Sequence, residues 1–352
     1  MEVGQTNRIS GMDGLRGCSI LFVLIGHSAG SANLPHFISV ALDLIPGSLA
    51  VFGVEIFFLI SGFIITHILL KKSELNFKDF YIKRAFKILP PLLVYFTFLF
   101  FVSIFTSFNL DLKGIIAGLL FIYNLQIFEV SNLCLHHLWS LSIEEQFYFV
   151  WPFALILLRK KSLRYASSII IFVMIVQFAS RLTFPNELIL SAFRFQYILM
   201  GCLLALNYSK IITYLDSHYN LLIYISLSLV ILSFLLRLGS TINPFSYEIS
   251  TIIRSLGLGG LTIISTSNQR NIFYYVFNNR ILGWLGLISY SIYIWQQFMF
   301  WPEPRYVGEV VNKSVFPLNM FLSILVGAVS YYTIEVNAFK CRSWVLRHHC
   351  KK

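Results

Sequence analysis

Apolar runs of about twenty residues recur along this chain, and they constrain its fold more than any other feature. They extend from residue 18 to residue 336 with only short polar breaks. A helix needs roughly 20 apolar residues to cross the hydrocarbon core of a bilayer, and it satisfies its own backbone hydrogen bonds there. The runs do not alternate apolar and polar residues, as the strands of a membrane barrel would. The sequence therefore predicts an all-α integral membrane protein.

Hydropathy places about ten transmembrane helices in the chain. A further apolar stretch near 114–128 is short for a span, and we expect it to be re-entrant or to lie at the membrane interface. The breaks leave no room for a soluble domain, so we expect residues 1–352 to form a single transmembrane domain without an extra extracytoplasmic domain. The predicted spans are 17–34, 49–70, 89–108, 138–158, 165–183, 188–208, 219–239, 248–267, 281–301 and 317–337.

The positive charges are unevenly distributed among the predicted loops. With 114–128 left out as a span, 20 of the 27 Lys and Arg residues lie on the side of the amino terminus, whereas Arg181 and Arg237, near the ends of their spans, are among the few on the other side. Cytoplasmic loops carry such an excess, so both termini are predicted to be cytoplasmic. Topology explains the net charge of +11 without nucleic acid. The five cysteines are scattered, and they indicate neither a disulfide framework nor a metal site.

Arg16 and His27 stand out among the polar residues of the first span. They are eleven residues apart, so they share one helical face at a separation of roughly 16 Å along the axis. An arginine at the cytoplasmic entrance can bind phosphates, and a histidine can accept a proton from an attacking hydroxyl. The alternative is that Arg16 anchors the helix at the membrane surface and that His27 is a packing residue.

Several long motifs resemble the membrane proteins of acyltransferase family 3. The resemblance implies transfer of an acyl group, often acetyl from acetyl-CoA, to carbohydrate at the cytoplasmic (inner) membrane of bacteria. In order, the motifs are RISGMDGLRGCSILFVLIGHS at 8–28, FGVEIFFLISGFIIT at 52–66, FYIKRAFKILPPL at 80–92, LWSLSIEEQFYFVWP at 138–152 and LGLISYSIYIWQQ at 285–297.

The same resemblance assigns the catalytic roles. Arg16 and His27 match the essential pair of the family, with His27 as the catalytic residue. Ser140 and Glu144 match its Ser and Glu pair, which shares one helical face because the two residues are four apart. Glu144 is expected to orient the imidazole or to hold an acceptor hydroxyl. The alternative for this pair is capping and dipole compensation at a helix amino terminus.

Donor binding is predicted at the start of the third span. Arg84 and Lys87 lie three residues apart on one helical face, and together with Arg16 they are expected to bind the phosphates of the CoA donor. The family usually has two arginines at this spacing, and Lys87 keeps the charge but loses the bidentate fork. A purely topological role is the alternative.

Three residues are candidates for acceptor binding. Arg194 lies in a segment similar to one of the family, and Gln296 occupies a region where many relatives have His. Glutamine can hydrogen-bond a sugar but cannot act as a base. Trp139, with Tyr148 and Trp151, either provides an aromatic platform for a sugar or belongs to an interfacial belt, which is the commoner use of such residues.

Isolated charges in the other spans are costly in a bilayer. Glu55, Arg254 and Glu335 are of this kind. We expect them to pair with one another, or to line a cavity, in partnerships that the sequence does not specify.

The predicted function is that of a membrane O-acetyltransferase. It would take acetyl-CoA as donor and a lipid-linked or surface glycan as acceptor, most specifically lipopolysaccharide O-antigen or another surface polysaccharide, in contact with membrane lipid and without a metal. A flippase or transporter of a lipid-linked sugar is the alternative, because ten spans with buried charges also suit alternating access.

Overall fold

In the computed structural model, every regular element of the described chain is a helix. Seven helices are long and apolar enough to cross a membrane, or up to eight when a bent pair is counted as one span. This fits a multi-pass membrane protein, whereas the total of ten spans and the side of each terminus stay predictions. The structure describes residues 9–29, 31, 33–43, 49–72, 76–106, 108–125, 132–183, 195–238, 244–300 and 315–349.

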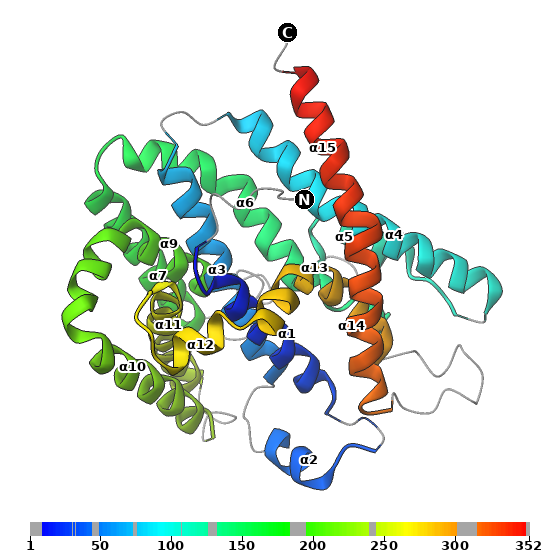
Figure 1. The fold of residues 1–352 in the computed structure, drawn as a ribbon, viewed down its shortest axis with the longest axis horizontal. Helices are drawn as coiled ribbons and strands as arrows, with labels where there is room; N and C mark the ends of the chain where they lie inside the picture. Colours follow the sequence, from blue (N-terminus) through cyan, green and yellow to red (C-terminus); the bar gives the residue numbers. More distant parts are fainter. Residues whose placement is uncertain are drawn as a thin grey trace. The chain divides into compact units, whose positions relative to one another are not determined.

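The helices follow one another through the chain with short connections (Figure 1). Two short 3₁₀ turns lie between α5 and α6, and a π turn joins α14 to α15. In order the elements are α1 (Met12–His27), α2 (His36–Asp43), α3 (Leu49–Leu70), α4 (Phe77–Phe105), α5 (Leu112–Leu119), η2 (Tyr123–Leu125), η3 (Leu133–Leu135), α6 (Leu138–Arg159), α7 (Leu163–Thr183), α9 (Gln196–Leu206), α10 (Tyr208–Leu238), α11 (Pro244–Thr266), α12 (Ile272–Phe277), α13 (Arg280–Phe300), α14 (Leu318–Ser330), η4 (Tyr331–Glu335) and α15 (Val336–His349).

Two predicted spans differ from the helices observed. The span at 17–34 ends as a helix at His27, so α1 has only 16 residues. The described part of the span at 188–208 is the 11-residue helix α9, which bends by 72° into the start of α10. Asn207 stands at this bend and donates its side-chain amide to the Leu203 carbonyl at 2.9 Å, which satisfies an acceptor at the end of α9.

The stretch near 114–128 does not form a span in its described part. It contains α5, of eight residues, which begins after the capping side chain of Asp111. A 3₁₀ turn follows at Tyr123–Leu125. The prediction of a short element is confirmed, and its placement as re-entrant or interfacial stays a prediction.

The chain divides into two compact units, which we describe separately. The first comprises residues 1–23, 42–71 and 143–287, and the second comprises residues 24–41, 72–142 and 288–352.

In the first unit, glycines allow α3 and α9 to pack with their backbones in close contact. A Cβ atom added to Gly62 would lie 2.0 Å from the carbonyl oxygen of Ile198, and one added to Gly201 would lie 2.1 Å from that of Leu59. Small residues permit this kind of packing between membrane helices. The two helices are therefore tightly packed against each other within the first unit.

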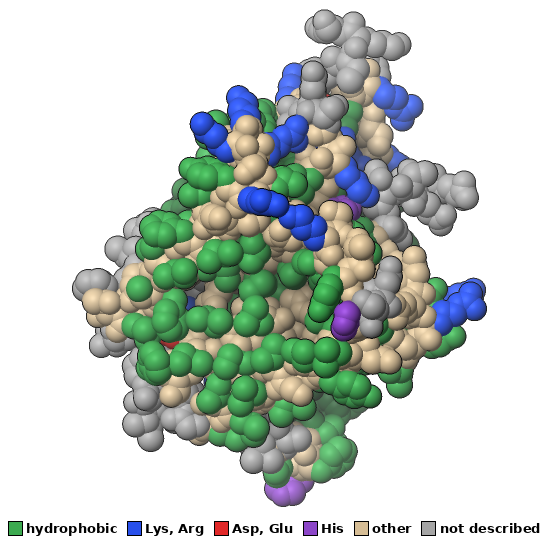
Figure 2. All heavy atoms as spheres, turned by 90° about the vertical axis from the view of Figure 1, so that its left-hand side faces the viewer, with side chains coloured by type: hydrophobic (Ala, Val, Ile, Leu, Met, Phe, Trp, Pro, Cys, Tyr) green, Lys and Arg blue, Asp and Glu red, His purple; other side chains and the backbone are tan. Residues whose placement is uncertain are grey.

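Many apolar side chains of α7 and α10 are exposed, and Figure 2 shows that apolar side chains predominate on one side of the molecule. Exposed apolar surface of this extent is unusual in a soluble monomer, and it suits contact with lipid tails. The exposed residues include Ile171, Phe172, Ile175 and Val176 on α7, and Leu221, Tyr224, Ile231 and Leu235 on α10.

The second unit has an apolar core between α4, the start of α6 and α13. Leu92, Tyr95 and Leu99 of α4 are fully buried in this core, with Leu138 of α6 and Trp295 of α13. The helix that runs through α14, η4 and α15 is continuous in Figure 1, where it is coloured orange to red. The core positions the ends of α4, α6 and α13 relative to one another, and the candidate site is built there.

Candidate functional site

His27 lies at the end of α1, where its ring meets a glutamine of α13. Its Nδ1 is 2.6 Å from Oε1 of Gln296. Because an amide oxygen can only accept, Nδ1 carries the proton and Nε2 carries the lone pair. The pair therefore presents a neutral imidazole with a basic nitrogen, which can act as a general base or as a nucleophile.

The amide of Gln296 is itself held in place. Its Nε2 donates to Oε1 of Gln297 at 3.3 Å, and Nε2 of Gln297 donates to the Leu133 carbonyl at 3.0 Å. Both glutamines are buried. These hydrogen bonds determine that the oxygen of the Gln296 amide faces His27. In the structure Gln296 therefore contacts His27, whereas the sequence analysis proposed that it binds a sugar.

A second histidine, His137, lies in the same unit, and the sequence analysis did not single it out. It is 3% exposed, and its ring is in edge contact with the rings of Tyr95 and Tyr293, each at a centroid distance of 5.6 Å. His27 is close enough to affect its charge electrostatically. The signal was its position directly before the LWSLSIEEQ motif and the predicted span 138–158, since a histidine next to an apolar span is a functional candidate.

Ser140 lies beside His137 on the first turn of α6. Its hydroxyl contacts the hydroxyl of Tyr293 and donates to the His137 carbonyl at 3.0 Å. The Tyr293 hydroxyl donates to the same carbonyl at 3.1 Å. Ser140 therefore connects α6 to α13 next to the histidine, which is more than a capping role.

Glu144, the predicted partner of Ser140, has other contacts. One of its carboxylate oxygens accepts from Ser61 at 2.6 Å and from Tyr148 at 2.7 Å, and all three residues belong to the first unit. The described partners are hydroxyls, so the predicted contact with an imidazole stays a prediction.

Two of the three aromatic residues singled out on α6 are buried within their own unit. Tyr148 and Trp151 are both buried, and Trp151 donates its indole N–H to Thr66 at 2.8 Å. The choice between an interfacial belt and a sugar platform stays open. Trp139 is half-buried and packs against the apolar core of the second unit.

The predicted donor residues lie on two helices. Arg84 and Lys87 are half-buried on α4, and Lys87 interacts electrostatically with Glu335 in η4. Arg16 is half-buried on α1 in the first unit. Arg194 lies outside the described residues, and its role stays a prediction.

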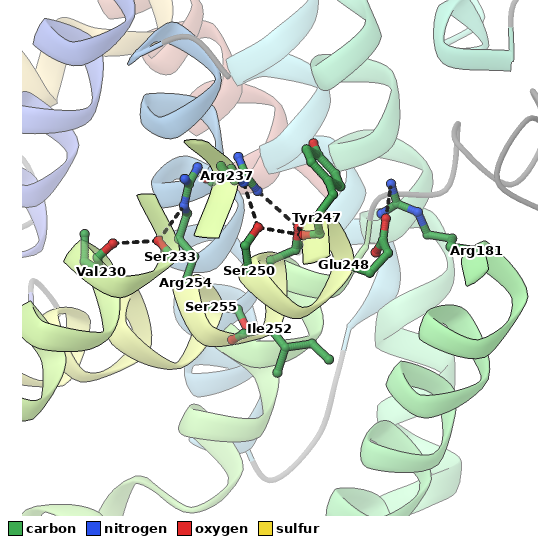
Figure 3. Close-up of polar contacts among 12 residues, drawn as sticks. Arg181, Val230, Ser233, Arg237, Tyr247, Glu248, Ser250, Ile252, Arg254 and Ser255 are labelled. Atoms are coloured by element: carbon green, nitrogen blue, oxygen red, sulfur yellow. Dashed lines mark hydrogen bonds and ion pairs between the residues drawn. The ribbon is translucent and has the colours of Figure 1, made fainter. Parts of the chain in front are cut away.

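Buried charges form a separate cluster in the first unit (Figure 3). Glu55 accepts from Arg254 at 3.1 Å and pairs with Arg237 at 3.6 Å. Buried charges therefore pair with one another, as expected, although the sequence did not specify these partners. Arg237 is only 2% exposed and turns towards the carboxylate of Glu55, and the side of the membrane to which it belongs stays a prediction. Glu335 instead accepts from Ser291 at 2.5 Å in the second unit.

Within the described residues, no group of three or more His, Cys, Asp and Glu side chains is placed to hold a metal ion. His27, Gln296, His137 and Ser140 all lie in the second unit.

Comparison with known proteins identifies the class to which this fold and site belong. The model of the family described as "Acyltransferase domain" matches residues 9–334, so the chain belongs to that family. Peptidoglycan O-acetyltransferase OatA of Listeria monocytogenes is 27% identical over 82% of this chain and 48% of its own length. A Staphylococcus aureus protein named "Putative O-acetyltransferase" is 26% identical over 93% of this chain and 56% of its own.

The chain spans about half the length of these relatives. No solved structure matches it significantly.

Proposed function

We propose that this protein is a membrane O-acetyltransferase that moves an acetyl group from acetyl-CoA to a hydroxyl of a surface sugar. The observation that carries the proposal is the hydrogen bond between His27 and Gln296, which leaves the lone pair on Nε2 of a half-buried imidazole. Membership of the acyltransferase family and the names of the relatives support it.

In the proposed reaction, Nε2 of His27 removes the proton of the sugar hydroxyl while its oxygen attacks the thioester carbon. The carbon–sulfur bond then breaks, and the CoA sulfur leaves with the proton that His27 returns. A two-step route, in which Nε2 first takes the acetyl group, uses the same residue.

For the donor, the cationic side chains of α4 are the proposed phosphate ligands. Arg84 supplies a guanidinium group, which suits phosphate geometry, and Lys87 supplies an ammonium group. Binding at these residues would hold the nucleotide end of CoA on the cytoplasmic side, while the same role for Arg16 rests on the sequence motif alone.

Two classes of acceptor fit the proposal. The sequence motifs favour lipopolysaccharide O-antigen or another surface polysaccharide, whereas the name of the Listeria relative indicates peptidoglycan. Both present sugar hydroxyls, and the chemistry at His27 is the same for either. The first experiment therefore examines both glycans of one host.

Replacing His27 with alanine is expected to abolish glycan acetylation, because no other described group takes the place of the Gln296-bound imidazole. Mass spectrometry of polysaccharide and peptidoglycan from cells that express the wild type, His27→Ala or no protein measures the added acetyl groups. His36→Ala, at an exposed histidine of α2, is the matched control and should acetylate as the wild type does.

Equal acetylation by the wild type and His27→Ala would refute the role of His27. Glycans that are identical with and without the wild-type protein would refute transfer to that host's glycans. Loss of glycan export in His27→Ala cells would instead favour the flippase.

Replacing Lys87 with methionine is expected to raise the KM for acetyl-CoA by about 10- to 150-fold, because hydrogen bonds to charged groups contribute about 1.5–3 kcal/mol. Turnover of labelled acetyl-CoA in membrane vesicles measures this. Lys87→Arg should keep the wild-type KM, and Lys83→Met, at an exposed position of the same helix, is the control. An unchanged KM in Lys87→Met would exclude Lys87 from donor binding.

A further inference from the structure

We infer that His137 is a second catalytic group, which donates an N–H hydrogen bond to the carbonyl oxygen of the acyl donor. The inference rests on the proposed acyl transfer and adds a residue to it. It is carried by the burial of His137, by its unsatisfied ring nitrogens and by its position near His27.

Both ring nitrogens of His137 are buried, and neither makes a hydrogen bond within the structure as described. Buried polar groups in proteins almost always have a partner, because leaving one unsatisfied is costly. An imidazole with two such atoms is therefore a site where a ligand group is expected to supply the missing partner.

The polar groups around the ring are already committed to other partners. The Cys134 carbonyl lies near His137 but outside hydrogen-bonding geometry, and it accepts from the Tyr95 hydroxyl at 2.8 Å. The hydroxyls of Tyr293 and Ser140 are directed to the backbone carbonyl of His137. Together these bonds hold the backbone and the flanking rings, and they leave the imidazole nitrogens for a substrate.

The two histidines come from distant parts of the sequence but lie in one unit. His27 is fixed by Gln296 of α13, and His137 is in contact with Tyr293 of the same helix. Tyr293 and Gln296 are three positions apart in the sequence, so the two lie on one face of α13. Helix α13 thereby holds the basic nitrogen of His27 and the unsatisfied imidazole of His137 along one of its faces.

This arrangement suits the two charges that develop during acyl transfer. When the sugar oxygen bonds to the thioester carbon, the electron pair of the C=O bond moves to its oxygen. A neutral imidazole carries one N–H in either tautomer, so His137 can donate to that oxygen while His27 holds the proton. The C=O bond then re-forms, the carbon–sulfur bond breaks, and the sulfur leaves with the proton from His27.

The test compares His137→Leu, which cannot donate, with His137→Gln, which keeps an N–H. His136→Gln, at the exposed neighbouring histidine, is the matched control. Removal of one donor to a developing oxyanion lowers kcat by about 10²–10³, so we expect a loss of this size in His137→Leu, a smaller loss in His137→Gln and none in the control. Glycan acetylation is measured at equal amounts of protein.

Thermal unfolding of the purified variants separates catalysis from structure. His137→Leu removes two unsatisfied polar atoms, so its melting temperature should equal or exceed that of the wild type. Wild-type acetylation by His137→Leu would overturn the inference, and so would a parallel fall in its activity and melting temperature. If the wild type itself transfers no acetyl group, the proposed function fails instead.

Discussion

Replacing Glu55 with glutamine is expected to lower the free energy of unfolding by about 3–5 kcal/mol, the usual cost of breaking a buried ion pair. Glu55 accepts from Arg254, whose side chain is fully buried, and pairs with Arg237. The variant keeps the shape of the side chain but leaves two cationic groups without their counterion. The melting temperature in detergent measures the effect.

Glu248→Gln is the matched comparison for Glu55→Gln. Glu248 pairs with Arg181 at 3.0 Å, and the Arg181 side chain is 13% exposed, so this cation can reach polar surroundings when the carboxylate is lost. We therefore expect a smaller decrease in melting temperature. Equal decreases in the two variants would contradict a special role for Glu55 in neutralising the charges of Arg237 and Arg254.

Replacing Gln296 with leucine should lower the acetylation rate by about 100-fold while His27 remains present. The amide oxygen fixes the proton on Nδ1, and a catalytic histidine held in the wrong tautomer loses up to about 10⁴ in rate in serine proteases. Leucine has a similar size but cannot accept a hydrogen bond. Acetyl groups transferred per unit time to the host glycan, at equal protein levels, measure the loss.

Gln296→Glu provides the control, because its carboxylate can accept the same hydrogen bond from Nδ1. It should retain much more activity than Gln296→Leu. If both variants lose activity equally, the role of Gln296 is packing or acceptor binding rather than orientation of His27.

The sequence predicted the elements that depend on local composition. Long apolar runs such as 49–70 and 165–183 appear as α3 and α7, and the short run near 114–128 contains the eight-residue α5. The motif around His27 also identified the residue that the structure places in a hydrogen bond to α13. These features follow from patterns within about twenty neighbouring residues.

The sequence could not specify contacts between distant segments. Gln296 is 269 residues from His27, and Arg254 is 199 residues from Glu55. The chemistry of these side chains indicated that each needs a polar partner, but the sequence did not indicate which residue that partner is. His137 was overlooked because the recognised motif begins one residue after it. The 72° bend after α9 falls where the predicted span 188–208 ends, and the apolar pattern does not indicate how the next helix is directed.

The π turn between α14 and α15 determines how Glu335 is held. Ser330 and Glu335, at either end of this turn, both contact the hydroxyl of Ser291, at 3.2 and 2.5 Å. In a regular α-helix, residues five apart point about 140° away from each other, so one serine could not meet both. The wide turn brings them into line, and deletion of a single residue there would rotate the carboxylate out of reach of Ser291.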